Sequence, residues 1–535
     1  MSAPAAINPG SIKILQDTRP GVQAGVAAMH AGLMQNGRVI FLDKVEKYAQ
    51  INTTDNDWAY SAEYDPVTNQ VVPLKYKTNA FCSGGAFLAD GRWVSIGGNA
   101  PLDVDKSVGN GFSAVRFLSR SATDASLNGQ DWVEDQTKWK LNSPRWYASV
   151  QTMPDGRLFV ASGSKTGLNV LDNINNNPTW EILSPTGVST TGSTNMTILQ
   201  NNLPTYMYPF IHLLNDGTLF VFVSKSAEIF NVNTGQTIKS LPDLVGDTRT
   251  YPNTGGSVLL PLSSANGWAP DIIICGGGSY QDITSPTDPS CGRMQPLSAT
   301  PRWEMDSMPE GRGMVEGTLL PDGTVLWVNG CNQGAQGFYL AKNPTLEVLI
   351  YDPIAALGQR WHTGPSSTIA RLYHSVALLL LDGTLMIAGS NPVEQPVLTP
   401  VPNHTPNWDY VTEYRVEIYT PPYLSGDNAN RRPTAIALSS KTLTANSQKF
   451  NIQFTAPAGA KAVKVALYHG GFVTHSLHMN HRMLFLDTTG FAAGSTAQTI
   501  TVNMPPNKNV AQPGPYVVYV TVDGVPGIGQ FVSVS

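Results

Sequence analysis

The sequence predicts an all-β protein in which a seven-bladed β-propeller precedes a small immunoglobulin-like β-sandwich. Three observations carry this prediction. A short phrase, a few apolar residues followed by Asn-Gly or Asp-Gly and then by a β-rich segment, recurs along most of the 535 residues. Only 14% of the residues are charged while 49 are glycine and 39 are proline, a composition that favours strands and turns over helices or disorder. Near residue 425 the phrase stops, and short alternating strands replace it.

Seven copies of the phrase can be counted. Their turns are Asn36-Gly37, Asp90-Gly91, Asp155-Gly156, Asp216-Gly217, the looser Asn266-Gly267, Asp322-Gly323 and Asp382-Gly383. Such a pair between apolar β runs predicts a hairpin with a type I′ turn, which needs positive φ at both central residues. The spacing of roughly 50–65 residues is typical of kelch-type propeller blades with long insertions. Because one blade cannot bury both faces of its sheet, we expect a closed ring over residues 15–425, with a solenoid as the alternative.

A polar linker at residues 425–430 separates the repeats from the rest of the chain. Beyond it, residues 449–454, 462–467 and 515–520 alternate or run apolar as short strands do. About a hundred residues of this pattern predict a β-sandwich of immunoglobulin type. We therefore place one domain at residues 1–428 and a second at 429–535.

Charge and hydropathy exclude several classes of partner. The net charge is -5 and no basic stripe is present, which argues against nucleic acid and anionic membranes. No apolar run approaches the length of about 18 residues that spans a bilayer. The start, residues 1–6, lacks the charged and apolar regions of a signal peptide, so the protein is either cytosolic or secreted with its signal removed. Three sequons, at Asn52, Asn195 and Asn403, permit secretion, and we expect an extracellular protein.

Metal-capable side chains stand at equivalent points of three repeats, just upstream of the predicted inner strand. These are Cys82 in the second repeat, Tyr147 in the third, and Tyr373 with His374 in the seventh. Equivalent points of different blades meet around the axis of a propeller, so these residues should converge near one end of it. The first and sixth repeats place Met29-His30 and Met314-Val315 there, so the alignment alone does not create a site.

Tyr373 and His374 are neighbours in the sequence, which constrains how they could share one metal. In a regular strand, neighbouring side chains point to opposite faces. Both can therefore reach a metal only at a strand end, where the backbone bends, and the pattern places them there. A core tyrosine beside a buried, hydrogen-bonded histidine is the alternative.

The C-terminal part adds three histidines, His475, His478 and His481. A zinc site is disfavoured, because His475 and His478 would face opposite sides of a strand and no Cys or carboxylate completes a tetrahedral set. One histidine on a hairpin tip that reaches into the propeller axis is the functional interpretation. A solvated loop histidine is the alternative.

Together these motifs resemble those of a known family. Phe81-Cys82, Tyr147, the run from Arg371 to Ser375 and the run from Val473 to Ser476 are similar to the active-site signatures of the copper radical oxidases, the galactose oxidase and glyoxal oxidase family. Residues 29–46 resemble the glyoxal oxidase branch. The resemblance implies one copper ion bound by Tyr147, His374 and His475 in a plane, with Tyr373 as a weak axial ligand. It also implies that Cys82 is joined to the ring of Tyr147 by a thioether.

The resemblance implies a reaction as well. Two electrons would be divided between Cu(II) and a radical on the thioether-linked Tyr147, while Tyr373 takes the substrate's proton as general base. Dioxygen would return as H2O2, which extracellular peroxidases could use. No flavin or nicotinamide is implied, and no dinucleotide glycine fingerprint follows a strand.

Two departures from galactose oxidase bear on the substrate. The position of its stacking tryptophan is Lys165 here, which leaves Trp146 or a loop aromatic to protect the radical. Its galactose-binding arginine has no counterpart near residues 203–208, whereas Tyr280 and Gln281 resemble its substrate-side pair. We therefore expect oxidation of small aldehydes such as glyoxal or methylglyoxal, as their hydrates, to carboxylic acids. The alternatives are a primary alcohol oxidase and, from another class, a non-catalytic kelch propeller that binds a partner.

The remaining cysteines allow one disulfide. Cys275 and Cys291 could close a loop that carries Tyr280 and Gln281. Cys331 would then be free.

Overall fold

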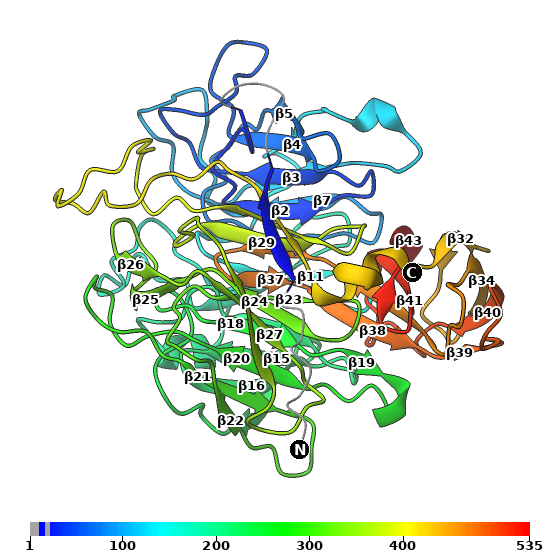
Figure 1. Cartoon of the computed structure of the whole chain (residues 1–535). Helices are drawn as coiled ribbons and strands as arrows, with labels where there is room; N and C mark the ends of the chain where they lie inside the picture. Colours follow the sequence, from blue (N-terminus) through cyan, green and yellow to red (C-terminus); the bar gives the residue numbers. More distant parts are fainter. Residues whose placement is uncertain (1–9, 16–21) are drawn as a thin grey trace.

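The computed structural model describes residues 10–15 and 22–535, so the predicted start at residues 1–6 lies outside the described residues. Among the described residues, seven antiparallel sheets form the blades of the propeller (Figure 1); six have four strands, and that of blade 1 gains two more from a C-terminal hairpin. The structure therefore confirms the predicted all-β fold.

The first four blades follow the order of the chain, with the inner strand first. Blade 1 is β2 (His30–Leu33), β3 (Val39–Leu42), β4 (Ser61–Asp65) and β5 (Gln70–Leu74), and blade 2 is β6 (Gly84–Phe87), β7 (Trp93–Ile96), β8 (Val115–Leu118) and β9 (Val133–Glu134). Blade 3 is β10 (Ser149–Thr152), β11 (Leu158–Ala161), β12 (Thr179–Leu183) and β13 (Thr194–Asn195). Blade 4 is β14 (Phe210–Leu213), β15 (Leu219–Val223), β16 (Ser226–Asn231) and β17 (Gln236–Leu241).

The last three blades carry small additions. Blade 5 is β18 (Gly256–Leu259), β20 (Ile272–Cys275), β21 (Ser290–Met294) and β22 (Glu304–Ser307); blade 6 is β23 (Glu316–Leu319), β24 (Val325–Val328), β27 (Glu347–Tyr351) and β28 (Trp361–Ser366), with the hairpin β25 (Cys331–Gly334) and β26 (Ala341–Pro344); blade 7 is β29 (Ser375–Leu379), β30 (Leu385–Gly389) and β31 (Glu417–Thr420). Its outer strand is β1 (Ser11–Ile14), which pairs antiparallel with β31. The two ends of the propeller segment thus close the ring together, and the ring begins before the predicted residue 15.

Helical structure is short within the described residues. It comprises η1 (Ala125–Leu127), α1 (Thr197–Asn201), η2 (Ser264–Asn266), η3 (Pro422–Leu424) and η4 (Gly426–Asn430). Of these, η4 lies in the stretch at residues 425–430 that the sequence marked as a linker.

The hairpin loops correct the predicted turn type. In blade 1 the amide of Gly37 donates to the carbonyl of Met34 (2.8 Å), and the glycine alone is left-handed, with φ of 78°. The side-chain oxygen of Asn36 accepts from the amide of Arg38 (3.1 Å), so the Asn36 side chain forms a local turn with the backbone two residues on. The result is a type I turn followed by a left-handed glycine. The same pattern recurs at Gly91, Gly156, Gly217, Gly323 and Gly383, whereas Gly267 ends η2.

The C-terminal part is a sandwich of two sheets. One contains β33 (Thr442–Leu443), β35 (Val463–His469), β38 (Arg482–Leu486), β41 (Gly514–Val522), β42 (Val525–Pro526) and β43 (Gln530–Val534), and the other contains β32 (Thr434–Leu438), β34 (Lys449–Thr455), β39 (Thr488–Thr489) and β40 (Ala497–Asn503). Alternate residues of β34 are buried, as the sequence predicted. A propeller segment, β19 (Leu262–Ser263), pairs parallel with β38 and so ties the two parts together.

A hairpin from the C-terminal part enters the propeller axis. Its strands are β36 (Phe472–Thr474) and β37 (Leu477–Met479), and β36 pairs antiparallel with the inner strand β2. In Figure 1, β37 lies amid the inner strands β2, β29 and β23. Hairpin side chains bond to several blades: Asn480 accepts from the amide of Thr152 (2.6 Å), and Arg482 donates to the carbonyl of Leu213. These bonds fix how deep the hairpin tip sits.

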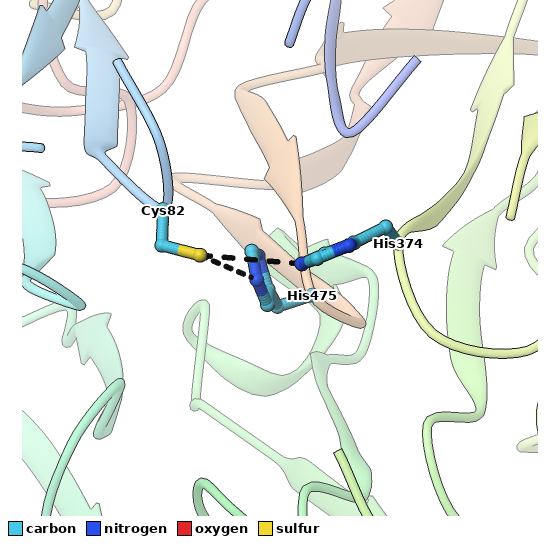
Figure 2. Close-up of side chains that lie close together, drawn as sticks. All are labelled: Cys82, His374 and His475. Carbon is cyan, nitrogen blue, oxygen red and sulfur yellow. Dashed lines mark hydrogen bonds between the residues drawn. The ribbon is translucent and has the colours of Figure 1, made fainter. Parts of the chain in front are cut away.

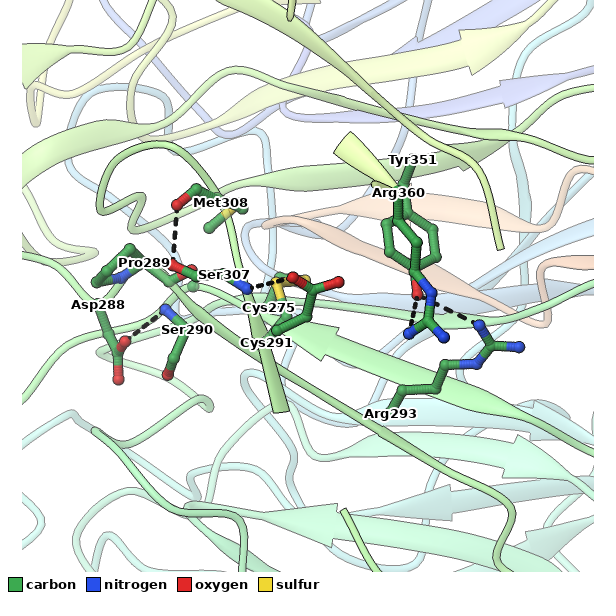
Figure 3. Close-up of a disulfide and its surroundings, with 12 residues drawn as sticks. Cys275, Asp288, Pro289, Ser290, Cys291, Arg293, Ser307, Met308, Tyr351 and Arg360 are labelled. Carbon is green, nitrogen blue, oxygen red and sulfur yellow. Dashed lines mark hydrogen bonds between the residues drawn. A yellow bond between two sulfur atoms is a disulfide. The ribbon is translucent and has the colours of Figure 1, made fainter. Parts of the chain in front are cut away.

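The predicted disulfide is confirmed. Cys275 and Cys291 face each other on the paired strands β20 and β21 and are bonded (Figure 3). The loop between them carries Tyr280 and Gln281. Cys82 and Cys331 are free and buried among the described residues.

Candidate metal centre

The chain enters most inner strands through a left-handed residue. The residues concerned are Ala28, Cys82, Tyr147, Tyr208, Met314 and His374, with φ between 48° and 69°. For residues other than glycine this conformation costs about 1–3 kcal/mol each. The bend breaks the alternation of the strand, so that the rings of Tyr373 and His374 stack with their centroids 3.6 Å apart. The bend therefore lets both side chains face the same region, and their sharing of one metal stays a prediction.

His475, the remaining residue of the predicted site, lies at the tip of the axial hairpin. His475 and Ser476 form its two-residue loop, with φ of 48° and 69°. Positive φ at both central residues is what a type I′ turn requires. The turn type that the sequence predicted for the blades thus occurs here, without glycine, and it places His475 on the hairpin tip.

The predicted residues converge. Cys82 Sγ lies 3.1 Å from His475 Nε2 and 4.0 Å from His374 Nε2 (Figure 2), and the hydroxyl oxygens of Tyr147 and Tyr373 are 2.9 Å apart. All five side chains are at most 1% exposed. Among the described residues, Cys82, His374 and His475 form the one cluster of at least three His, Cys or acidic residues with metal-binding spacing.

A backbone hydrogen bond brings Cys82 and Tyr147 together. The amide of Tyr147 donates to the carbonyl of Cys82 (3.0 Å), which links the starts of blades 2 and 3. The Cys82 thiol also lies close enough to the Tyr147 phenol to raise its pKa. This arrangement holds the sulfur next to the tyrosine ring.

Both histidines present Nε2 to the cluster because Nδ1 is occupied. His374 Nδ1 donates to the carbonyl of Asn391 (3.0 Å), and His475 Nδ1 lies 2.5 Å from Thr474 Oγ1. Burial holds the pKa of both imidazoles well below 6.5, so they are neutral. A neutral imidazole with a bonded Nδ1–H is the form that binds a metal through Nε2.

The two tyrosines are phenols in the metal-free protein. Burial raises the pKa of Tyr147 and of Tyr373 well above 10, and the neighbouring Cys82 adds to the effect. One phenol therefore donates to the other across the 2.9 Å contact. A bound cation would reverse this preference, since it stabilises the phenolate.

The resulting donor set can be compared with known metal preferences. Two imidazole nitrogens and two phenol oxygens converge in a buried space, with one thiol beside them. Nitrogen and oxygen donors of this kind suit Cu(II), whereas structural zinc sites prefer Cys and His in a closed tetrahedron. The residues present therefore fit a copper ion.

A polar network lies behind His374. The side-chain amide of Asn391 donates to Glu46 (2.6 Å), and the ammonium of Lys44 bonds to the same carboxylate. Burial lowers the pKa of Lys44 to about 8. This buried pair fixes the backbone whose carbonyl orients the His374 ring.

The sequence missed a third tyrosine. The ring of Tyr251 lies 4.2 Å from that of Tyr147 at 36°, closer than the ring of Trp146, which lies at 5.0 Å and 49°. Tyr251 precedes the inner strand of blade 5, as Tyr147 does in blade 3. The repeated motif Arg-X-Tyr, at Arg145, Arg249 and Arg371, could have revealed it. In each case the buried arginine pairs with an acid of its own blade: Glu181, Asp288 and Glu417.

Aromatic rings surround the cluster on its outer side. Phe338 stacks on Phe81 (5.8 Å, 19°) and lies 6.0 Å from the ring of His374. Tyr280 is 67% exposed, and Gln281 lies near Gly337, next to Phe338. Lys165, at the position expected for a stacking aromatic, bonds through its amide to Asn175. Tyr280 and Gln281, the residues predicted to bind the substrate, thus belong to loops outside the aromatic rings.

The other two hairpin histidines lie away from the cluster. His478 Nε2 bonds to Glu316 (2.6 Å), whose carboxylate also accepts from the amide of Ala377. His481 Nε2 bonds to the hydroxyl of Tyr468 (3.1 Å). Both anchor the hairpin in the axis.

Comparison with known proteins agrees with this geometry. A family model described as glyoxal oxidase N-terminus matches residues 29–423, and one described as galactose oxidase-like, early set domain matches residues 432–534. Aldehyde oxidase GLOX of Vitis pseudoreticulata is 30% identical over 95% of each chain, and aldehyde oxidase GLOX1 of Arabidopsis thaliana is 30% identical over 96% of this chain and 83% of its own. A solved fungal alcohol oxidase of the AA5 family, in complex with copper, matches with a TM-score of 0.74 over 99% of this chain and 100% of its own. At 20% identity, that likeness concerns the fold.

Proposed function

The chain belongs to the glyoxal oxidase family of copper-dependent oxidoreductases, and we propose that it oxidises small aldehydes, as their hydrates, to carboxylic acids. The observation that carries the proposal is the convergence of two neutral imidazoles and two phenols, with a thiol held beside one phenol. A non-catalytic binding propeller gives no reason for this set of buried groups.

His374, His475, Tyr147 and Tyr373 would hold the copper. Bound there, copper supplies a one-electron acceptor next to the ring of Tyr147. Cys82 Sγ would form a bond to a ring carbon of Tyr147. Forming this thioether removes one hydrogen from the thiol and one from the ring, and O2 takes both as H2O2. Sulfur donation to the ring makes the phenol easier to oxidise.

Tyr373 and Tyr147 have different roles in the proposed reaction. The overall reaction, RCH(OH)2 + O2 giving RCOOH + H2O2, removes a proton and a hydrogen atom from the substrate along with one further electron. With the cation bound, Tyr373 would be a phenolate, and its Oη, beside Tyr147 Oη, would take the hydroxyl proton, a role for which a positioned base contributes about 10²–10⁴-fold. Oxidised Tyr147 takes the hydrogen atom of the adjacent carbon. Reduction of O2 returns Tyr147 to its oxidised form.

The surroundings favour small, uncharged substrates. The cluster is buried, and Phe81, Phe338 and Trp146 surround it with apolar rings. A sugar would need hydrogen-bonding groups close to the reacting carbon. Small primary alcohols fit the same space and are the alternative substrates within the family.

We propose secretion on the basis of the three sequons. Asn52, Asn195 and Asn403 are all exposed, so each could carry a glycan. No helix in the described part of the chain is long and apolar enough to cross a membrane. Extracellular peroxidases could use the H2O2 released.

The test begins with the intact mass of copper-loaded protein and a map of the Tyr147 peptide. Formation of the thioether leaves the protein lighter by two hydrogen atoms and joins the Cys82 and Tyr147 peptides through a bond that reductant cannot open. Cys82→Ser is the matched control. H2O2 release on glyoxal, methylglyoxal, primary alcohols and galactose then ranks the substrates. Copper binding without the cross-link would refute the radical mechanism, and absence of copper binding would leave a binding scaffold.

A further inference from the structure

A chain of buried polar groups connects His475 to the first inner strand. His30, the first residue of β2, is fully buried, and its Nδ1 lies 2.6 Å from Thr474 Oγ1. His30 Nε2 lies 3.2 Å from the carbonyl oxygen of Ala80. Thr474 Oγ1 in turn contacts His475 Nδ1 at 2.5 Å. None of these groups besides His475 has a role in the proposed reaction.

The direction of each hydrogen bond in this series follows from the carbonyl group of Ala80 at one end of it. A carbonyl oxygen can only accept, so the proton of His30 is on Nε2, which donates to Ala80. His30 is fully buried, and the nearby Arg116 disfavours a second positive charge, so its ring is neutral. A neutral ring with its proton on Nε2 accepts at Nδ1. The hydroxyl of Thr474 therefore donates to His30.

The direction of the remaining hydrogen bond, between Thr474 and His475, is then determined. With its one proton committed to His30, Thr474 Oγ1 can only accept from His475, so the proton of His475 is on Nδ1. The lone pair of His475 Nε2 is left facing Cys82 Sγ, 3.1 Å away. That is the tautomer a metal ligand needs.

His374 does not depend on such a chain. Its Nδ1 donates directly to the carbonyl of Asn391, which has no proton to offer. A threonine hydroxyl can donate or accept, so Thr474 alone would leave the His475 tautomer open.

We propose that His30 is a positioning residue that fixes the metal-binding tautomer of His475 through the hydroxyl of Thr474. The inference rests on the proposed function, because it assigns His475 as a copper ligand. Ala80 stands two residues before Cys82, so the same chain also ties the start of blade 2 to the hairpin tip. His30 thereby couples the position of the thiol to that of the histidine.

Copper(II) affinity, measured by competition with a chelator, tests the proposal. His30→Phe keeps a ring but removes the acceptor, and we expect copper to bind about 10–100-fold more weakly, as for other groups that orient metal ligands. His30→Asn keeps an acceptor near the Nδ1 position and should restore most of the affinity. His469→Phe is the matched control, since His469 is equally buried and bonds to the carbonyl of Pro515. It should bind copper as the wild type does.

The electron paramagnetic resonance spectrum of Cu(II) gives a second readout. His30→Phe should change the nitrogen hyperfine pattern, whereas His30→Asn should retain it. Unchanged affinity and spectrum in His30→Phe would overturn the proposal, as would an equal loss in His469→Phe. If His30→Phe does not fold, Thr474→Val should lose affinity and Thr474→Ser should keep it, and equal affinity of these two would also overturn it. Failure of the wild type to bind copper would refute the proposed function instead.

Discussion

The backbone amide of Tyr147 donates to the carbonyl oxygen of Cys82 at 3.0 Å, although 65 positions separate the two residues in the chain. Both residues are left-handed, with φ of 69° and 51°. The bond is made between the starts of two neighbouring blades, so the nearness of Cys82 to Tyr147 is built into the packing of those blades.

Cys82→Ala should abolish the cross-link and lower kcat by at least about 100-fold, an increase in the barrier of about 2.7 kcal/mol. The reason is that Tyr147 without sulfur is harder to oxidise. Copper content, measured by atomic absorption, should stay near that of the wild type because the imidazoles and phenols remain. A variant that keeps wild-type kcat would show that the thioether has no role.

Tyr373→Phe should lower kcat by about 10²–10⁴-fold through loss of the proton acceptor beside Tyr147. The cross-link should still form, since Cys82 and Tyr147 are untouched. Steady-state kinetics together with the peptide map separate these two effects. Loss of the cross-link in this variant would instead indicate that Tyr373 is needed to hold copper.

Tyr251→Leu should shorten the lifetime of the oxidised Tyr147, because it removes the ring that lies 4.2 Å away. Tyr251→Phe keeps the ring and should retain most of that lifetime. The decay of the radical absorbance after oxidation measures both, and Trp146→Phe serves as the comparison. If Trp146→Phe has the larger effect, Trp146 and not Tyr251 protects the radical.

The metal-free protein should lose stability as the pH falls below about 6.5. Burial lowers the pKa of His469 to about 4, so between pH 6.5 and 4 the unfolded chain binds a proton at this residue that the folded chain does not. Protonation therefore favours unfolding across that window, by about 1.4 kcal/mol per pH unit for each such histidine. Urea unfolding of the wild type and of His469→Phe from pH 7 to 4.5 checks this. The slope should be smaller in the variant, and parallel slopes would contradict the prediction.

Replacing Cys275 and Cys291 together by serine should lower the free energy of unfolding by about 3 kcal/mol, given the 16-residue separation that the disulfide closes. Copper content should be unchanged, because the disulfide joins β20 and β21 and touches none of the clustered residues. Thermal unfolding with and without reductant measures the effect. Cys331→Ser is the control, since this thiol is free and burial raises its pKa to about 12.

The sequence predicted the propeller because each blade repeats a turn and an apolar strand, and equivalent positions of a ring must meet at its axis. That argument placed Cys82, Tyr147, Tyr373 and His374 together, and the structure has them together. Their roles as ligands stay predictions, as does the domain boundary at residue 428. The resemblance to a family, not the spacing, singled out His475 among the three hairpin histidines.

What the sequence could not predict depends on side-chain hydrogen bonds. The turns were predicted as type I′ from Asn-Gly and Asp-Gly, but a side-chain oxygen such as that of Asn36 bonds locally and keeps its own residue out of the left-handed region. Tyr251 was missed since its motif falls in the loosest of the seven repeats. The importance of His30 emerges only from the directions of bonds made by residues far apart in the chain, at Ala80 and Thr474.

The axial hairpin has a consequence for how the protein is made. Ribosomes synthesise the blades first, and residue 475 leaves the exit tunnel when most of the chain already exists. Until that histidine arrives and pairs through Thr474 with His30 on the first blade, the centre lacks one of its nitrogen donors. On the proposed ligand assignment, a chain that stops before residue 475 would lack one copper ligand, and we expect such an interrupted chain to release no peroxide inside the cell that makes it.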